Sequence, residues 1–568
     1  MKEENKMKYK YPRIKLSGTD LLNRAGVIYS QILNDLLMKV DEGGGEYDKG
    51  FFHTSTTTMT TPNYYHTMWS RDVGRGIMEL ARAGLIDAAK SSVDYIMSIG
   101  LSCGDHYGRI FSSDNPTSIE GHYPHEVDGN VTLLMGIYMT WKYNGKNKKD
   151  GLQYLDNAKK VFGWFEKNAE NCPYGFLLAS KSELSGNPDT PYFIYPIFAT
   201  YGAIVVSQAY AEMSEYCELL DEKEKYEKLA KKFSDAIQKH LLSRGDNSDQ
   251  DTKTPPGVWL NGLDERTGKA AEIGDYGTRF FIHRWTRQLP FIQDYDLGLD
   301  KAQNKQLDLI NEASYKYIKD GMAEGYYFRK YGFVSNTCFG GMGGRHDDTM
   351  AGYGQNYFSQ AALIADDVNV YTKCIDGICR LAYDGDIVAP LTPDLNPWVM
   401  HECFTYENYE QGLDHTYGRT GDESRHIMHN PGDEGNLVQS AETLKTFAIL
   451  AGISSEDDIL IIKPRLPWEC TEAQIEDFPV VLPDNTMGRI SYDFKAERWR
   501  NKFTIKIKGI SPFKKVFVRL GPLPNVLCNE KELSLEWNIT RVNQATFLDK
   551  TVDTQGDDNL SITLINEK

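Results

Sequence analysis

The feature that most constrains the fold of this chain is a series of amphipathic segments that follow one another in pairs. Within each segment, apolar residues recur at three- and four-residue spacing, the pattern of a helix with a buried face. Each pair therefore predicts a helical hairpin. The clearest pairs are 73–83 with 86–99, 131–143 with 152–168, and 197–220 with 222–242, and further helices are expected at 21–40, 302–319, 357–365, 368–383 and 437–451.

About a dozen helices in pairs can close into a toroid of six hairpins, an (α/α)6 barrel, with a pocket built by the loops at one end. The alternative is an open helical solenoid, which requires a sequence repeat of fixed period. The chain has no such repeat, so the closed barrel is favoured. We predict a mainly α fold whose barrel domain covers residues 1–455.

The pattern of apolar residues changes after residue 455. Short runs of β-branched or alternating apolar residues, at 459–462, 503–507, 515–520 and 560–564, are separated by turn formers. Such runs are typical of strands joined by tight turns. Residues 456–568 are therefore predicted to form a β-sandwich domain that braces the barrel.

Composition excludes several classes of protein. The 568 residues, 40 % of them hydrophobic, suffice for a large core. A formal net charge of −17 argues against nucleic acid as a partner, because phosphate binding needs a concentrated basic surface. No run of about 18 apolar residues predicts a membrane span. Residues 1–13 lack the apolar core of a signal peptide, and the nine cysteines are mostly isolated, which predicts reduced thiols in a cytoplasmic protein.

A cluster of aromatic and charged residues lies directly before the helix expected at 73–83. It includes Tyr65, Trp69, Arg71 and Asp72. Asp72 could serve only as a helix cap, because a carboxylate at a helix N-terminus accepts backbone N–H groups and is favoured by the helix dipole. The cluster also suits a sugar, since flat rings stack on pyranose faces while charged groups bind hydroxyls. The residues alone leave both interpretations open.

The W-x-R-D core of this cluster, with the small-residue helix after it, resembles the first catalytic-barrel motif of the glucoamylase family of glycoside hydrolases. In that family the matching residues hold the terminal sugar, which implies this role for Trp69, Arg71 and Asp72. Asp128-Gly129 resembles part of the family's P-Q-x-D-G segment, although His125-Glu126 departs from it. Asp128 is therefore a candidate pocket residue, and capping of the next helix explains it equally well.

Hydrolysis of a glycosidic bond usually needs one protonated carboxylic acid and one ionised carboxylate. In the resembling family the acid lies in the loop between the fifth and sixth helices. Glu183, in the loop 174–186, occupies roughly that place. The tryptophan that usually precedes the acid is replaced by Ser182, so the match is one of position and not of motif.

The base is expected in the long segment 400–436, because bacterial glucoamylase-like enzymes carry it in the loop before the last barrel helix. Gly435-Asn436 resembles the start of that helix. Glu434 adjoins the junction, and Glu423 lies nearer the family's usual spacing. These two carboxylates are nearly equal candidates for the base. Glu410, which lies among tyrosines, is a weaker candidate for the base and is also a candidate for substrate binding.

Two other loops could line the pocket. One is aromatic and charged and contains Trp259, a candidate for contact with a sugar. The other is the glycine-rich run 340–348, which lacks the preceding strand and the G-K-[ST] ending of a phosphate-binding loop. No short ligand spacing typical of a zinc site occurs, so neither a metal nor a cofactor is predicted.

The sequence is most consistent with an exo-acting glycoside hydrolase that uses two carboxylates on an oligosaccharide or glycoside, and inversion is the habit of the resembling family. Sugar epimerases or isomerases, which share the barrel and use histidines, are one alternative. Disaccharide phosphorylases are a second, and a carbohydrate-binding protein without activity is a third. The sugar, the linkage and the oligomeric state are not determined by the sequence.

Overall fold

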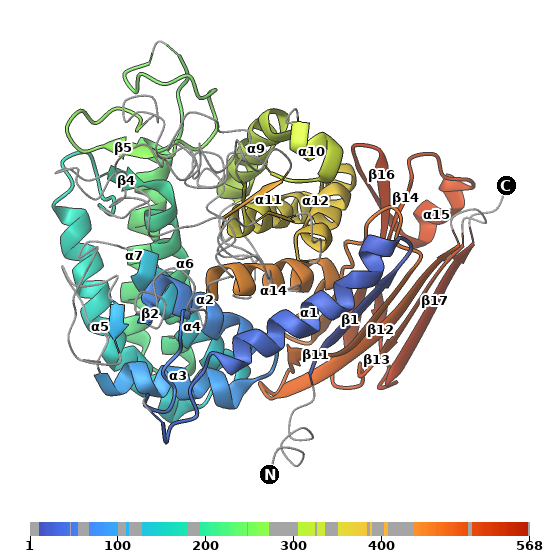
Figure 1. Ribbon diagram of the computed structural model, residues 1–568, viewed down its shortest axis with the longest axis horizontal. Coiled ribbons are helices and arrows are strands. Elements are labelled where there is room, and N and C mark those ends of the chain that lie inside the picture. Colours follow the sequence, from blue (N-terminus) through green and yellow to red (C-terminus); the bar gives the residue numbers. More distant parts are fainter. Residues whose placement is uncertain are drawn as a thin grey trace.

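The described helices up to Ala451 are mainly of two kinds, one buried on nearly all sides and the other on one side (Figure 1). Among the residues that the structure describes, no helix is both long and apolar enough to cross a membrane. The computed structural model describes residues 11–45, 47–54, 67–99, 110–112, 128–179, 194–246, 248–271, 305–323, 326–334, 350–382, 387–388, 403–406, 437–497 and 502–565.

The helices buried on nearly all sides form the inner ring of the barrel. Helix α2 packs against α4 and α14, α4 also contacts α6, and α14 contacts α11. Glycine allows the closest approach, since a Cβ atom on Gly74 of α2 would lie 2.3 Å from the carbonyl carbon of Thr132 on α4. The inner helices are α2 (Ser70–Arg82), α4 (Asp128–Tyr143), α6 (Ile197–Tyr216), α11 (Gly352–Ile364) and α14 (Leu437–Ala451).

Helices with one buried face surround this ring. Helix α7, for example, buries Tyr226, Leu229, Phe233 and Ile237 along one stripe and turns its lysines and glutamates outward. The predicted helix pairs and the (α/α)6 barrel are thereby confirmed. The outer helices are α1 (Asp20–Met38), α3 (Ile86–Ile99), α5 (Lys148–Glu170), α7 (Leu220–His240), α9 (Lys305–Ala323) and α12 (Val368–Leu381), with the short α10 (Tyr326–Tyr331) after α9.

Three inner helices are preceded directly by a very short strand, which the sequence analysis did not predict. Strand β2 (Thr67–Trp69) leads into α2 and pairs with β3 (Ile110–Ser112). Strand β4 (Ile194–Pro196) leads into α6 and pairs with β5 (Gly262–Asp264). The third group consists of β6 (Met350–Ala351) before α11, with β8 (Cys403–Tyr406) and β7 (Ile387–Val388). Each of these small sheets therefore includes a strand that lies directly before an inner helix.

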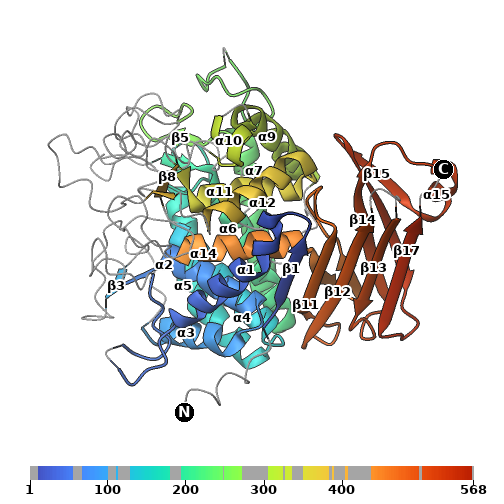
Figure 2. The ribbon, with the colours of Figure 1, turned by 45° about the vertical axis from the view of Figure 1, so that its right-hand side comes forward.

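The β domain lies beside the barrel and contains two five-stranded sheets (Figure 2). Alternate residues of the strands face inward, such as Phe503, Ile505 and Ile507, which have no exposed surface. In one sheet all neighbours are antiparallel, and in the other β10 and β14 run parallel. The antiparallel sheet has the strand order β1 (Arg13–Ser17), β11 (Glu472–Val481), β12 (Met487–Glu497), β13 (Lys502–Lys508), β17 (Asn559–Ile565). The mixed sheet has the order β15 (Asn538–Val542), β16 (Ala545–Asp553), β14 (Lys515–Pro524), β10 (Ile459–Ile462), β9 (Ile453–Glu456). A short helix, α15 (Glu530–Glu536), precedes β15.

The predicted division between residues 455 and 456 requires a correction at the N-terminus. Strand β1 pairs antiparallel with β11, with Ile14 opposite Ile475 and Leu16 opposite Ala473. Residues 13–17 therefore belong to a sheet of the β domain and not to the barrel. The physical reason is the alternation in this strand, since Ile14 and Leu16 are buried while Arg13 and Lys15 are exposed.

A buried ionic network joins the two domains. Arg519 of β14 donates bonds of 2.7 and 2.9 Å to the carboxylate of Asp549 on β16, and one of 2.6 Å to Asp366, which follows α11. Nε of Arg465 lies 3.4 Å from the same Asp366 carboxylate. Because Arg519 and Asp549 belong to the sheet while Asp366 belongs to the barrel, the network fixes one unit against the other.

Candidate active site

The inner helices begin at the same end of the barrel. Gly74 and Thr132, which touch, each lie four residues beyond the first residue of their helices. Arg75 and Glu442, which form an ion pair, each lie five residues beyond the first residues of α2 and α14. Helices α2, α4 and α14 therefore run parallel with their first turns level. Their N-termini present partial positive charge at this end, which we call the barrel mouth.

Arg71 and Asp72 lie at the barrel mouth, in the first turn of α2. Nε of Arg71 is 3.7 Å from Oδ2 of Asp72, and their side chains are 15 % and 4 % exposed. The start of α4 is adjacent, because a Cβ atom on Gly129 would lie 2.3 Å from Oγ of Ser70. An arginine and a carboxylate in this position can bind neighbouring hydroxyl groups with charge-assisted hydrogen bonds.

The backbones of two other residues that were predicted to contact the sugar also lie at the barrel mouth. Trp69 ends strand β2 and is paired with Ile110 of β3. Asp128 is the first residue of α4. The chain thus brings the W-x-R-D motif and the Asp-Gly motif, far apart in sequence, to two helix starts that touch each other.

Trp259 corrects the sequence prediction. Its ring has no exposed surface, and its indole N–H donates a 2.9 Å hydrogen bond to Oδ1 of Asn311 on α9. The backbone N–H of Trp259 donates to Oγ of Ser314, also on α9. In this arrangement the ring packs in the core between helices and is not available to stack on a sugar. A loop tryptophan with a buried hydrogen-bond partner is a structural residue.

Tyr65 and the four candidate carboxylates lie outside the described residues. Glu183 belongs to the segment that leads into β4 and α6, and Glu410, Glu423 and Glu434 belong to the segment that leads into α14. Tyr65 precedes β2. All of them therefore stay predictions, and each precedes an inner helix that begins at the barrel mouth.

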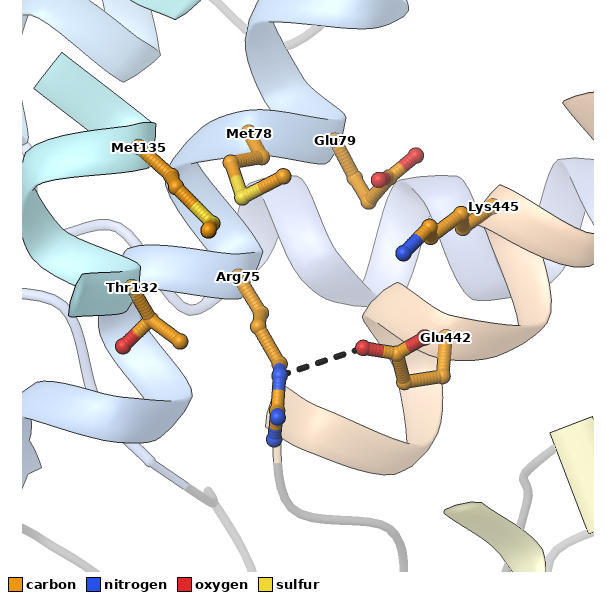
Figure 3. Close-up of a pocket in the computed structure, with 7 residues that line it drawn as sticks. All are labelled: Arg75, Met78, Glu79, Thr132, Met135, Glu442 and Lys445. Carbon is orange, nitrogen blue, oxygen red and sulfur yellow. Dashed lines mark ion pairs between the residues drawn. The ribbon is translucent and has the colours of Figure 1, made fainter. Parts of the chain in front are cut away.

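Several charged side chains of α2 and α14 are buried below Asp72. We call them the buried ionic layer: Arg75, Glu79 and Arg82 of α2 with Glu442 and Lys445 of α14. Nε of Arg75 lies 3.1 Å from Oε1 of Glu442, and Arg82 bonds to Glu79. Figure 3 shows Arg75, Glu79, Glu442 and Lys445 around a small pocket that Thr132, Met78 and Met135 also line, with room for roughly one water molecule.

The sequence analysis missed this layer because it read only the apolar stripe of α2 as facing a core. Asp72, Arg75, Glu79 and Arg82 are spaced three, four and three residues apart, so they form a second stripe along one face. All four are less than 10 % exposed. The sequence did offer a signal for this layer, because the same helix carries Gly74 and Gly76. Small residues indicate close helix packing, so a charged stripe on such a helix could have been predicted to be buried.

Burial shifts proton affinities within the layer. It raises the pKa of Glu79 to about 7, against the opposing effect of Arg82 and Lys445. Burial also lowers the pKa of Lys445, while Glu442 and Glu79 act in the opposite direction. The layer thus contains a carboxyl group that can exchange a proton near neutral pH.

The described part of the chain holds no group of three or more histidine, cysteine or carboxylate side chains able to ligate a metal ion. Cys172, Cys217, Cys374 and Cys379 are buried thiols without disulfide bonds.

The chain matches no protein family model and no curated protein sequence. Among solved structures it resembles an α-L-rhamnosidase from Dictyoglumus thermophilum, with 10 % identity and a TM-score of 0.53 over 98 % of this chain and 51 % of that one. It also resembles the Streptomyces avermitilis α-L-rhamnosidase solved with L-rhamnose, with 12 % identity and a TM-score of 0.51, over 98 % of this chain and 42 % of that one. A glucoamylase from Saccharomycopsis fibuligera matches with 11 % identity and a TM-score of 0.49, over 77 % and 96 % of the two chains.

These likenesses concern the fold. The chain has the six-hairpin fold found in glycosidases, as the resemblance of its W-x-R-D segment implied. The chain spans 51 % and 42 % of the lengths of the two rhamnosidase chains that it matches.

Proposed function

We propose that the chain is a glycoside hydrolase that releases a terminal sugar from an oligosaccharide or glycoside. The observation that carries this proposal is the Arg71–Asp72 pair at the start of an inner helix, at the end of the barrel where α2, α4 and α14 all begin. The six-hairpin fold that it shares with two α-L-rhamnosidases supports the same conclusion. Fold alone does not determine an activity, so the argument rests on the site.

Action on a terminal sugar is supported by the interior of the barrel. Arg75 and Glu442 lie one turn below Asp72, and their ion pair spans α2 and α14. Both side chains are less than 10 % exposed. The pocket beside this pair has room for roughly one water molecule, so a sugar chain held by Arg71 and Asp72 would end above it.

The proposed roles follow the sequence prediction. Trp69, Arg71 and Asp72 hold the terminal sugar, while Tyr65, Asp128 and Glu410 line the same pocket. Glu183 is the general acid that protonates the leaving oxygen, and Glu434 or Glu423 is the base that activates water. A direct attack by water on the far side of the sugar inverts the anomeric carbon, and we propose this course.

L-Rhamnosides are the first substrates to test, because two of the similar structures are α-L-rhamnosidases. The purified protein is offered nitrophenyl α-L-rhamnoside, matching glucosides and small oligosaccharides, with and without phosphate. Proton NMR follows the anomer released. Release of one terminal sugar with inverted configuration, independent of phosphate, is the expected result.

Variants test the assignment of residues. Glu183→Gln and Glu434→Gln should each lower kcat by about a thousandfold or more, because each removes a proton-transfer group. Asp72→Asn should lower kcat/KM by about a hundredfold through lost charge-assisted hydrogen bonds. Glu530→Gln, at an exposed carboxylate on α15, is the control and should leave the rates unchanged.

Three results would contradict the proposal. Epimerisation of a free sugar without cleavage would move the chemistry to loop histidines, and cleavage only with phosphate would indicate a phosphorylase. Binding of sugars without turnover would indicate a carbohydrate-binding protein. Full activity of Glu434→Gln with loss of activity in Glu423→Gln would exchange these two residues as the base.

A further inference from the structure

One carboxylate below the barrel mouth joins three inner helices. Glu442 of α14 is 2 % exposed, and its Oε1 lies 3.1 Å from Nε of Arg75 on α2. Its Oε2 accepts a 2.8 Å hydrogen bond from Nε2 of Gln360 on α11. The same amide nitrogen lies 3.1 Å from the carbonyl oxygen of Glu442. Both carboxylate oxygens are therefore held, each by a different inner helix.

Besides its ion pair with α14, Arg75 also contacts α11. Its Cζ lies 5.5 Å from the centroid of the Tyr357 ring, within the range of a cation–π interaction. Asn356 of α11 adds a 2.9 Å hydrogen bond to Oγ1 of Thr443, the neighbour of Glu442 on α14. The Arg75–Glu442 bridge thus sits where the faces of α2, α11 and α14 meet.

A bridge of this kind constrains the spacing between helices in addition to their close packing. If the helices shift, the buried carboxylate loses its arginine or amide donor and is left uncompensated. Because Arg75 and Glu442 are each five residues from the start of their helices, the bridge sets the relative height of the two first turns.

The first turns of α2 and α14 carry other contacts at the mouth. Asp72 lies one turn above Arg75 on the same helix face. The backbone N–H of Leu437, the first residue of α14, donates a 2.8 Å hydrogen bond to the carbonyl oxygen of Thr54. A shift of α14 along its axis would therefore displace this end of the barrel relative to Arg71 and Asp72.

We propose that Arg75 and Glu442 are positioning residues of the glycosidase site, holding the first turn of α14 level with the sugar-holding first turn of α2. This inference rests on the proposed function. Neither residue exchanges a proton with the substrate, and both act through the placement of the helices that carry the site. Their loss lowers the rate of the chemical step because a displacement of about 1 Å can cost about a hundredfold in rate.

The first experiment compares Glu442→Gln with Glu212→Gln. Glu212 is a control with a similar set of partners and a side chain that is 30 % exposed: it accepts a 2.5 Å hydrogen bond from Tyr138 of α4 and lies 2.9 Å from Nζ of Lys146. It also connects two parts of the inner ring, but near the last turn of α6, away from the mouth. Glu442→Gln should lower kcat by about 10- to 100-fold with KM changed less than about threefold, and Glu212→Gln should leave both constants near wild type.

A second variant separates position from stability. Arg75→Met combined with Glu442→Met removes both charges of the bridge, and the Gln360 amide keeps the backbone carbonyl oxygen of residue 442 as an acceptor, so thermal stability should recover relative to Glu442→Gln. The rate should stay low, because methionine side chains do not set the height of α14. Recovery of kcat together with stability would overturn the inference, since the bridge would then matter only for folding.

Hydrogen exchange tests the same idea without any activity. In Glu442→Gln the amides of the first turn of α14 should exchange at least about tenfold faster than in Glu212→Gln, because the helix start is less firmly held. Unchanged exchange there would overturn the inference. If the wild-type protein cleaves no glycoside, the proposed function fails, and the exchange result still decides whether the bridge holds the helix start.

Discussion

At the scale of the residue, Glu79 links the stability of the barrel to pH. Its pKa is raised from 4.5 to about 7 by burial, with Arg82 and Lys445 opposing the shift. Between these two pH values the folded protein keeps a proton on Glu79 that the unfolded chain has released. The free energy of unfolding therefore falls as pH rises from about 4.5 to 7, because the folded state binds more protons in that window.

Glu79→Gln should remove this dependence, since an amide cannot release the proton. Relative to wild type, the free energy of unfolding of the variant should increase by roughly 2 to 3 kcal/mol between pH 4.5 and pH 8. Urea unfolding at several pH values measures the difference. A constant difference across this range would show that Glu79 does not titrate there. Glu530→Gln, which changes an exposed carboxylate, is the control.

At the scale of the element, the barrel depends on how closely α2 and α4 approach. A Cβ atom on Gly74 would lie 2.3 Å from the carbonyl carbon of Thr132 and 2.4 Å from its oxygen. These are backbone atoms of a neighbouring inner helix, so no side chain can rotate away. A larger residue at this position must push the two helices apart.

Gly74→Ala should therefore lower the free energy of unfolding by about 1 to 3 kcal/mol or more, as overpacking does in other cores. Gly163→Ala is the matched control, because Gly163 lies in helix α5 with nothing within 4 Å of its added Cβ. That change should stabilise the protein by about 0.5 to 1 kcal/mol through helix propensity. Equal effects of the two substitutions in denaturant unfolding would contradict the close approach of α2 and α4.

At the scale of the whole molecule, Arg519 holds the barrel and the β domain together. It bonds to Asp549 within the sheet and to Asp366 beyond α11 in the barrel, and it is 5 % exposed. Removal of the guanidinium group leaves two carboxylates at a buried interface without their principal donor. The loss is larger than that of a surface ion pair, because water cannot replace the missing partner.

Arg519→Met should lower the free energy of unfolding by about 3 to 5 kcal/mol. Arg541→Met offers the comparison, since Arg541 pairs with Glu530 at 2.6 Å on the surface of the same domain and should cost less than about 1 kcal/mol. Thermal unfolding followed by calorimetry measures both. Similar losses in the two variants would show that the buried network does not hold the domains together.

A structural feature could be predicted from the sequence when it depends on residues that are close together along the chain. Helix positions were predictable because the spacing of apolar residues is a local pattern: 437–451 was expected and α14 spans the same residues. Strand β1 was not predicted, because five residues at the N-terminus become a strand only when β11, more than 450 residues later, supplies its partner. The candidate carboxylates Glu183, Glu423 and Glu434 lie outside the described residues and stay predictions.

Local sequence patterns were enough to predict the class of fold, the change from helices to strands near residue 455, and the W-x-R-D motif at the start of a helix. These follow from periodicity, β-propensity and residue type, which act along the chain. The packing of Trp259 in the core and the ion pair between Arg75 and Glu442 became evident from the three-dimensional structure. Their roles depend on neighbours hundreds of residues away or on other helices, and burial and charge pairing are properties of those neighbours and not of the local sequence.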